Sequence, residues 1–203
     1  WHAHEMIFGA MLAVVVGFLF TAGRAWTGLA TPRGPALGAL VGLWAAGRCA
    51  GLLAPAWAFA PVDGAFLLVV AAIFARLIWR ARQARNAGVA AVLGLLAVAN
   101  LAFHAAALGA WRIDAMQALH AALALLIVLE SVIGGRVIPA FTRSANPGLA
   151  LGERRRLDRG AIGTTALGLA LWIAGLPGAA PVLLLAATLQ ALRLVGWKPW
   201  VAR

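Results

Sequence analysis

The stretch VDGAFLLVVAAIFARLIW at residues 62–79 runs directly into RARQAR at residues 80–85. Similar apolar runs, rich in Ala and Leu, recur along the chain near residues 6–22, 36–53, 62–79, 87–108, 114–133, 161–175 and 179–194. Each run is about long enough to cross a hydrocarbon layer ~30 Å thick as a helix. We therefore predict an all-α, polytopic transmembrane bundle of about seven helices that forms a single domain over residues 1–203.

The composition excludes most classes of soluble protein. Hydrophobic residues make up 64% of the chain and charged residues only 11%, whereas soluble domains average roughly 45–50% and 25%. The net charge of +11 is spread over several loops and forms no basic face, so we expect a lipid bilayer and no nucleic acid as the partner.

The basic residues also give the helices a direction. Most of the 17 Lys and Arg residues follow the first, third, fifth and seventh apolar runs, and the other connections are nearly free of them. Under the positive-inside rule, the loop at residues 135–160 is cytoplasmic and residue 1 lies on the outer side of a bacterial inner membrane. Because the chain starts at Trp1, we expect an internal segment whose remaining partner helices belong to the full-length chain.

Once the helices are directed, all four histidines fall on the outer half. His104 and His120 lie on helices joined by a short link, and an imidazole at membrane depth can bind haem or another metal. The alternative is an interhelical hydrogen bond, for which Asn100, one turn from His104, is a ready partner. Arg48, also on the outer half, could pair with a haem propionate.

The opening Trp1–Met6, WHAHEM, is the densest set of possible ligands. His2, His4 and Met6 combine imidazole and thioether groups, which suit copper, and His2 and Met6 share a face if the helix begins early. Glu5 could orient a ligand histidine or move protons. Its alternative role is an ordinary anion near a helix N-terminus.

Other motifs favour structural roles. Asp63 and Asp114 stand at predicted helix starts, where capping explains both. Gly134 and Gly135 are expected to end the fifth helix, and Pro139 to prevent its simple continuation. Residues 134–143 do not match a P-loop, so nothing indicates a nucleotide site.

The stretches at residues 1–6 and 134–143, GGRVIPAFTR, together with Asn100 and His104, resemble the NnrS family of bacterial membrane proteins. The resemblance runs in order over most of the chain, but residues 22–28 depart from the family pattern by lacking an expected proline and asparagine. It implies a helical membrane protein that contains haem, taken as b-type, and copper, and that is associated with nitric oxide metabolism and tolerance of nitrosative stress.

Our leading hypothesis is a haem- and copper-binding protein of the response to nitric oxide, with nitric oxide or iron-nitrosyl species as partners. Its candidate cofactor-binding residues are His104, His120, Arg48 and Asn100, and its candidate metal-binding residues are His2, His4, Glu5 and Met6; which histidines would bind haem and which copper stays open at this point. One alternative is a membrane redox enzyme acting on nitric oxide or quinol, which needs an open metal position and a proton path through Glu5 or Glu130. Another is a small-solute transporter, for which paired broken helices are expected and not found. No residue is assigned a catalytic role.

Overall fold

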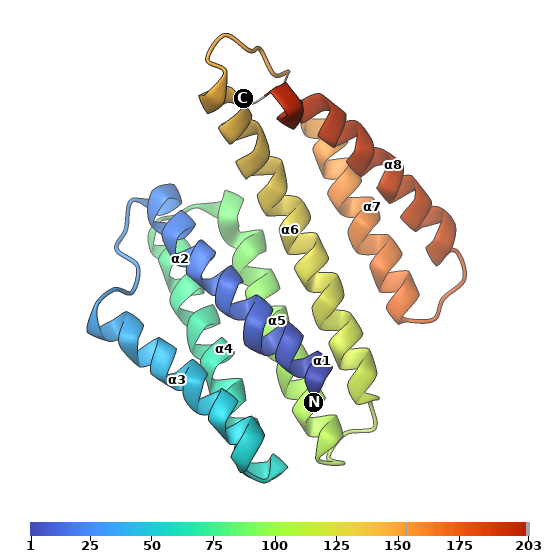
Figure 1. The fold of residues 1–203 in the computed structure, drawn as a ribbon. Coiled ribbons are helices and arrows are strands. Elements are labelled where there is room, and N and C mark those ends of the chain that lie inside the picture. The colour runs from blue at the N-terminus through green and yellow to red at the C-terminus, as the bar shows by residue number, and fades with distance from the viewer. Residues whose placement is uncertain (153, 202–203) are drawn as a thin grey trace. The chain divides into compact units, whose positions relative to one another are not determined.

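The computed structural model describes residues 1–152 and 154–201, and its regular secondary structure is entirely helical (Figure 1). The helices are α1 (His2–His4), the π-helix η1 (Glu5–Met11), α2 (Leu12–Thr27), α3 (Pro35–Leu53), α4 (Ala56–Arg80), η2 (Ala84–Asn86), α5 (Ala87–Ala107), α6 (Ala115–Ala145), α7 (Arg155–Ile173), α8 (Ala179–Trp197) and η3 (Pro199–Val201). Since α1, η1 and α2 join into one continuous helix, the predicted all-α fold of seven long helices is confirmed for the described residues.

The chain forms two compact units, Trp1–Leu123 and Ala124–Arg203, with the boundary inside α6. In the first unit α4 packs against α3, α5 and α2, and its core contains Leu19, Leu67, Phe74, Leu93 and Leu96. In the second unit α7 and α8 form an antiparallel hairpin (Figure 1).

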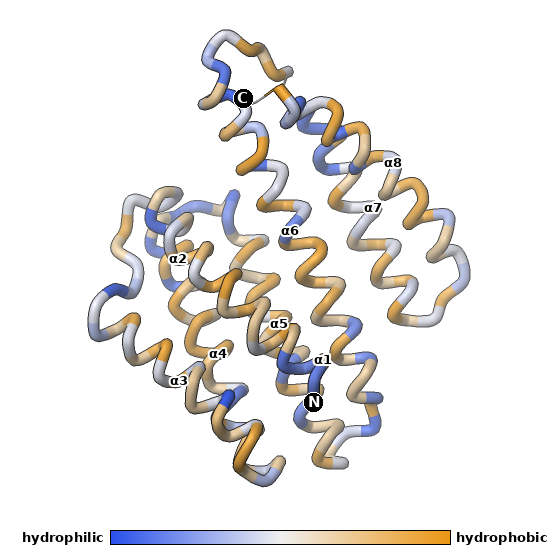
Figure 2. The backbone as a smooth tube through the Cα atoms, in the orientation of Figure 1, coloured by the Kyte–Doolittle hydropathy of each residue, from blue (hydrophilic) through white to orange (hydrophobic). Residues whose placement is uncertain are grey.

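Six of the long helices have the length and composition needed to cross a membrane: His2–Thr27, Pro35–Leu53, Ala56–Arg80, Ala84–Ala107, Ala115–Ala145 and Ala179–Val201. Hydrophobic residues colour most of their length, and hydrophilic ones gather at the turns (Figure 2). The exception is α7, which carries Arg155, Arg156, Asp158 and Arg159 at its start. The chain is thus a multi-pass membrane protein with six clear candidate spans.

The start of α4 differs from the sequence prediction. The helix begins at Ala56 and not after Pro61, because the carbonyl of Pro55 accepts hydrogen bonds from the N–H groups of Ala58 and Phe59 at 2.9 and 3.0 Å. Pro61 removes one intrahelical bond, to the carbonyl of Trp57. That carbonyl lies in the first turn of the helix, so the helix continues. The expected capping role of Asp63 is therefore wrong, since Asp63 lies two turns inside α4 and is buried.

The expected end of the fifth long helix at Ile133 is also wrong, because α6 continues through Gly134, Gly135 and Pro139 to Ala145. Neither glycine has the positive φ of a helix-ending residue. Gly135 serves close packing within the second unit: a Cβ atom there would meet the Arg193 guanidinium. The cap predicted at Asp114 is supported, since its Oδ1 accepts the N–H of Met116 at 3.0 Å.

A polar network holds the second unit together around Arg193, which is 2% exposed. Its Nε donates to Asp158 Oδ1 at 2.8 Å, and its Nη1 donates to Ser131 Oγ at 2.9 Å and to Gln190 Oε1 at 2.6 Å. The guanidinium also lies 4.7 Å from the ring centroid of Trp197. Each nitrogen of this buried cation has an oxygen partner (Nη2 bonds the carbonyl of Ser131), as a charge away from water requires.

Candidate metal centre

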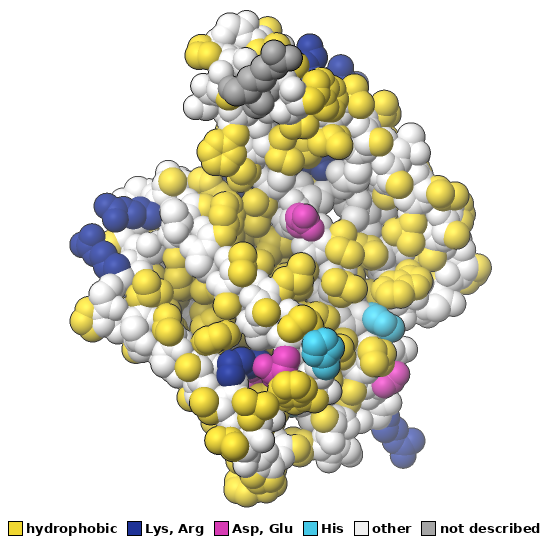
Figure 3. All heavy atoms as spheres, viewed as in Figure 1, with side chains coloured by type: hydrophobic (Ala, Val, Ile, Leu, Met, Phe, Trp, Pro, Cys, Tyr) yellow, Lys and Arg dark blue, Asp and Glu magenta, His cyan; other side chains and the backbone are white. Residues whose placement is uncertain are grey.

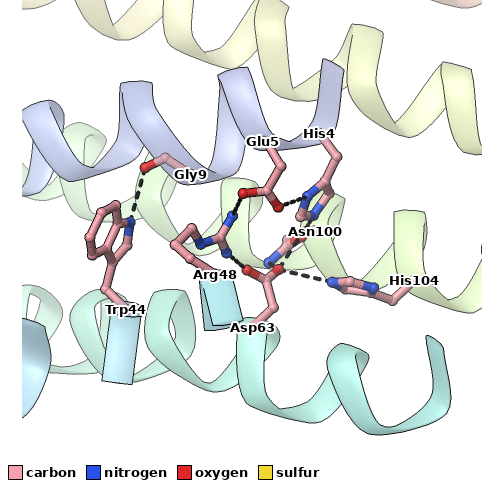
Figure 4. Close-up of polar contacts among 8 residues, drawn as sticks. All are labelled: His4, Glu5, Gly9, Trp44, Arg48, Asp63, Asn100 and His104. Atoms are coloured by element: carbon pink, nitrogen blue, oxygen red, sulfur yellow. Dashed lines mark hydrogen bonds and ion pairs between the residues drawn. The ribbon is translucent and has the colours of Figure 1, made fainter. Parts of the chain in front are cut away.

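Four helices of the first unit bring six polar side chains together in an otherwise apolar bundle (Figure 4). Figure 3 shows few charged and histidine side chains on a face that is otherwise hydrophobic or uncharged, and most of the cluster is buried beneath the surface. The members of this cluster are His4 on α1, Glu5 on η1, Arg48 on α3, Asp63 on α4, and Asn100 and His104 on α5. They all come from those ends of the helices that the charge pattern places on the outer side.

Asp63 is the hub of the cluster. Its Oδ2 accepts hydrogen bonds from Asn100 Nδ2 and lies within bonding distance of His104 Nε2, both at 2.9 Å, while its Oδ1 pairs with Arg48. The Asp63 side chain is only 2% exposed. A carboxylate this deep in a helical bundle is strongly unfavourable without such partners.

His4 is fully buried and has oxygen atoms at both ring nitrogens. Its Nδ1 lies 3.3 Å from Glu5 Oε1, and its Nε2 lies 3.0 Å from Asn100 Oδ1 and 3.3 Å from Asp63 Oδ2. Because Asp63 can only accept, Asn100 must turn its Nδ2 toward Asp63, which leaves Oδ1 facing His4. A neutral imidazole has a single N–H and cannot donate on both sides. A cation at Nε2 would satisfy the oxygens there while the Nδ1–H donates to Glu5.

Three of these side chains can serve together as metal ligands. One ligand atom each from His4, Asp63 and His104 lie within 4.8 Å of one another, and all three residues are buried. Imidazole nitrogen and carboxylate oxygen are ordinary ligands for divalent transition metals. The two carboxylates of the cluster face one guanidinium, that of Arg48, so with neutral imidazoles one negative charge remains for a bound cation to offset.

Aromatic rings surround the two histidines. The ring of His4 stacks on Phe103 with centroids 4.5 Å apart and lies 5.0 Å from Phe8. Phe59 meets His104 edge to face at 4.9 Å. These rings exclude water from the ligand nitrogens, which strengthens any interaction with a cation.

The π-helix η1 sets the direction of His4 and Glu5 at the start of the first long helix. A π turn leaves backbone carbonyls poorly bonded, and here Trp44 Nε1 on α3 donates to the carbonyl of Gly9 at 3.0 Å (Figure 4). Gly9 also provides room, because a Cβ there would lie 2.8 Å from Arg48 Nη1. Glu5 Oε2 accepts from that same nitrogen at 2.5 Å. The irregular helix thus places the carboxylate of Glu5 between Arg48 and His4, as π segments at functional sites often do.

Replacing Trp44 by phenylalanine is expected to weaken this arrangement without removing a ligand. The Gly9 carbonyl keeps the backbone N–H of Leu12 but loses the indole donor, which costs about 1 kcal/mol, and we expect bound metal to be held several-fold less tightly. Metal titration of the purified protein measures the change. Trp57→Phe is the matched control, because Trp57 is 72% exposed and should leave affinity unaltered; equal losses in both variants would contradict a role for the Trp44 contact.

The structure brings together five of the residues singled out from the sequence: His4, Glu5, Arg48, Asn100 and His104. His2 and Met6 are exposed and lie outside the cluster. His120 is partly buried on α6 and is not among the three grouped ligands. Sequence reasoning missed Asp63 as a ligand, although a carboxylate just inside an apolar run was a signal available there.

A family model described as NnrS protein matches residues 1–203, the full length of the chain. Comparison with curated proteins and with solved structures finds no significant match. The sequence blocks at residues 1–6 and 134–143 and the helical architecture agree with the family match. The chain therefore belongs to the NnrS family.

Proposed function

We propose that this chain binds copper and haem in the bacterial inner membrane and acts in the response to nitric oxide and nitrosative stress. The observation that carries the proposal is the buried group of His4, Asp63 and His104 in a member of the NnrS family. The positive-inside pattern supports an outer location for the group, with the arginine-rich turns in the cytoplasm.

The ligand set is compatible with copper. Two imidazoles and a carboxylate bind Cu(II) well, and copper forms the most stable complexes among the divalent first-row metals. When bound, the metal would supply redox chemistry and open coordination positions, since the group of described ligands that would hold it numbers three. Glu5 would orient His4 through Nδ1, Asn100 would hold Asp63, and Arg48 would offset one of the two carboxylate charges.

The same geometry argues against haem between His4 and His104. The two ring centroids are 5.1 Å apart, and Asp63 Oδ2 contacts both Nε2 atoms. A porphyrin held by two imidazoles needs the space between their nitrogens, which the carboxylate fills. Among the four histidines this leaves His2 and His120 as candidate haem ligands. Arg48, already paired with Glu5 and Asp63, is unsuited to a propionate.

We expect the amount of bound copper to depend on the buried ligands His4 and His104 and not on the exposed residues His2 and Met6. In the full-length protein, His4→Ala and His104→Ala should each lower bound copper at least tenfold, while His2→Ala and Met6→Leu should retain it. Elemental analysis of monodisperse protein with electron paramagnetic resonance of Cu(II) measures this. Loss of copper in the His2 or Met6 variant alone would place the site at the exposed residues and overturn the proposal.

A second candidate is a redox enzyme acting on nitric oxide, favoured by the open coordination that three protein ligands leave. Consumption of nitric oxide by the purified protein with an electron donor distinguishes the two functions. Turnover that disappears in His104→Ala would favour the enzyme. Copper binding without turnover would favour a role in binding or protection.

A further inference from the structure

At the opposite end of the first unit, a hollow of about 660 Å³ lies between the end of α4 and the start of α5. One part of its lining, here called the apolar wall, is formed by Ala75, Ile78, Ala87 and Ala90. Arg80, Arg82 and Gln83 line the other part, here called the charged rim. Ala75 and Arg80 are five residues apart, about 7.5 Å along the helix axis, so the apolar wall and the charged rim belong to one hollow.

The two arginines have no charge to balance them. Arg80 and Arg82 are exposed, and neither has an ion pair or hydrogen bond from its side chain to any residue that the structure describes. No acidic residue occurs between Asp63 and Asp114. The hollow therefore carries a net positive charge. The turn between α4 and α5 is hydrophilic (Figure 2), and it lies at the level of the headgroups if these helices span the bilayer.

The backbone at Arg82 supports a role for its side chain. Its N–H bonds the carbonyl of Trp79 at 3.0 Å, and the N–H of Gln83 bonds that of Ile78 at 3.3 Å. This is the helix ending in which the residue in the position of Arg82 takes a left-handed conformation and is usually glycine. Arg82 has φ +52°, and Lys198 is the other described non-glycine residue with positive φ. An L-residue in that conformation costs roughly 1–2 kcal/mol.

The turn is also held rigidly. Gln83 Nε2 donates to the carbonyl of Trp26 at 2.5 Å, and Gln83 Oε1 accepts from Asn86 Nδ2 at 2.7 Å. Trp79, 81% exposed beside the hollow, is the type of residue that settles at the headgroup layer. The arginines are therefore presented from a fixed turn, next to an interfacial indole.

We infer that this hollow binds an anionic phospholipid, with the phosphate at Arg80 and Arg82 and an acyl chain along the alanine-lined wall. Basic pockets at the cytoplasmic ends of transmembrane helices bind such headgroups. A free phosphate would use the arginines but not the apolar wall. A zwitterionic lipid would use the wall but not the full charge of the rim.

The test uses the full-length protein in detergent, titrated with phosphatidylglycerol and, separately, with phosphatidylcholine of the same acyl chains, and read by native mass spectrometry. Each arginine near an anionic lipid contributes about fivefold in affinity. Arg82→Gly should therefore weaken phosphatidylglycerol binding about fivefold, and Arg80→Gln with Arg82→Gly about 25-fold. Phosphatidylcholine binding should not change, and millimolar inorganic phosphate should not displace the lipid.

Arg82→Gly separates lipid binding from folding, because glycine relieves the left-handed strain and should raise the thermal unfolding midpoint. Lys198→Gly is the matched control: it relieves the same strain and removes one basic residue outside the hollow, so lipid binding should stay at the wild-type level. Equal weakening in both glycine variants, equal affinity for the two lipids, or displacement by inorganic phosphate would overturn the inference.

Discussion

Asp63→Asn is expected to lower copper affinity at least about 100-fold, the largest effect of any conservative change in the cluster. The substitution keeps the size of the side chain and removes the carboxylate that contacts both imidazoles. It also places an amide N–H group among donors from Arg48, Asn100 and His104, leaving at least one of them unpaired. Breaking a buried ion pair in this way costs about 3 kcal/mol.

Thermal unfolding with and without copper separates these two effects. A ligand that binds only the folded state raises the unfolding midpoint in proportion to the logarithm of its concentration over its dissociation constant. Wild-type protein should show this rise, and Asp63→Asn should not, whatever its own midpoint. Asp114→Asn is the control, because Asp114 is an exposed cap. A copper-induced rise of wild-type size in Asp63→Asn would exclude Asp63 as a ligand.

The adjacent glycines of α6 are expected to respond to alanine in opposite directions. A Cβ at Gly135 would clash with Arg193 Nη2, and that guanidinium is held by Asp158, Ser131 and Gln190. It cannot move without leaving a buried charge poorly bonded, so Gly135→Ala should destabilise the protein by about 2–3 kcal/mol.

At Gly134 the nearest atom to an added Cβ is Ile138 Cδ1 at 3.7 Å, an ordinary contact. Gly134→Ala should therefore stabilise the helix by about 0.5–1 kcal/mol, because alanine loses less conformational freedom on folding than glycine. Unfolding midpoints in detergent measure both changes. If both variants shifted the unfolding midpoint in the same direction, close packing against Arg193 would not explain why position 135 is a glycine.

The sequence was sufficient to predict the seven long helices and insufficient to place all of their ends. Apolar length identified the six candidate membrane spans, because crossing a bilayer requires it, and the apolar run at residues 161–175 indicated α7. Pro61 and the pair Gly134 and Gly135 were expected to mark helix boundaries from local propensity, and each instead lies inside a helix. Local rules failed where tertiary contacts decide: Arg193 needs a residue without a side chain at position 135, and the bond lost at Pro61 falls in a first turn.

The types of side chain in the candidate site could be predicted from the sequence, but the exact set of residues could not. His4, Glu5, Arg48, Asn100 and His104 stood out because polar groups are rare in apolar runs. Asp63 was interpreted as a cap because its helix was expected to begin at residue 62. One misplaced boundary therefore hid the residue that joins the two histidines. His4 and not His2 is buried in the cluster because of contacts between helices, and these contacts cannot be derived from a single sequence.

The π-helix at Glu5–Met11 means that the ligand geometry depends on chain length as well as on residue type. A segment with i→i+5 bonding accommodates an additional residue within a helix whose two ends stay fixed. A chain one residue shorter in this stretch would form a regular α-helix that keeps His4 and Glu5 in place, whereas the present chain wound as a regular α-helix would turn both by about 100° around the helix axis, away from the cluster. The opening motif is thus meaningful only together with the number of residues that separate it from the rest of the first helix.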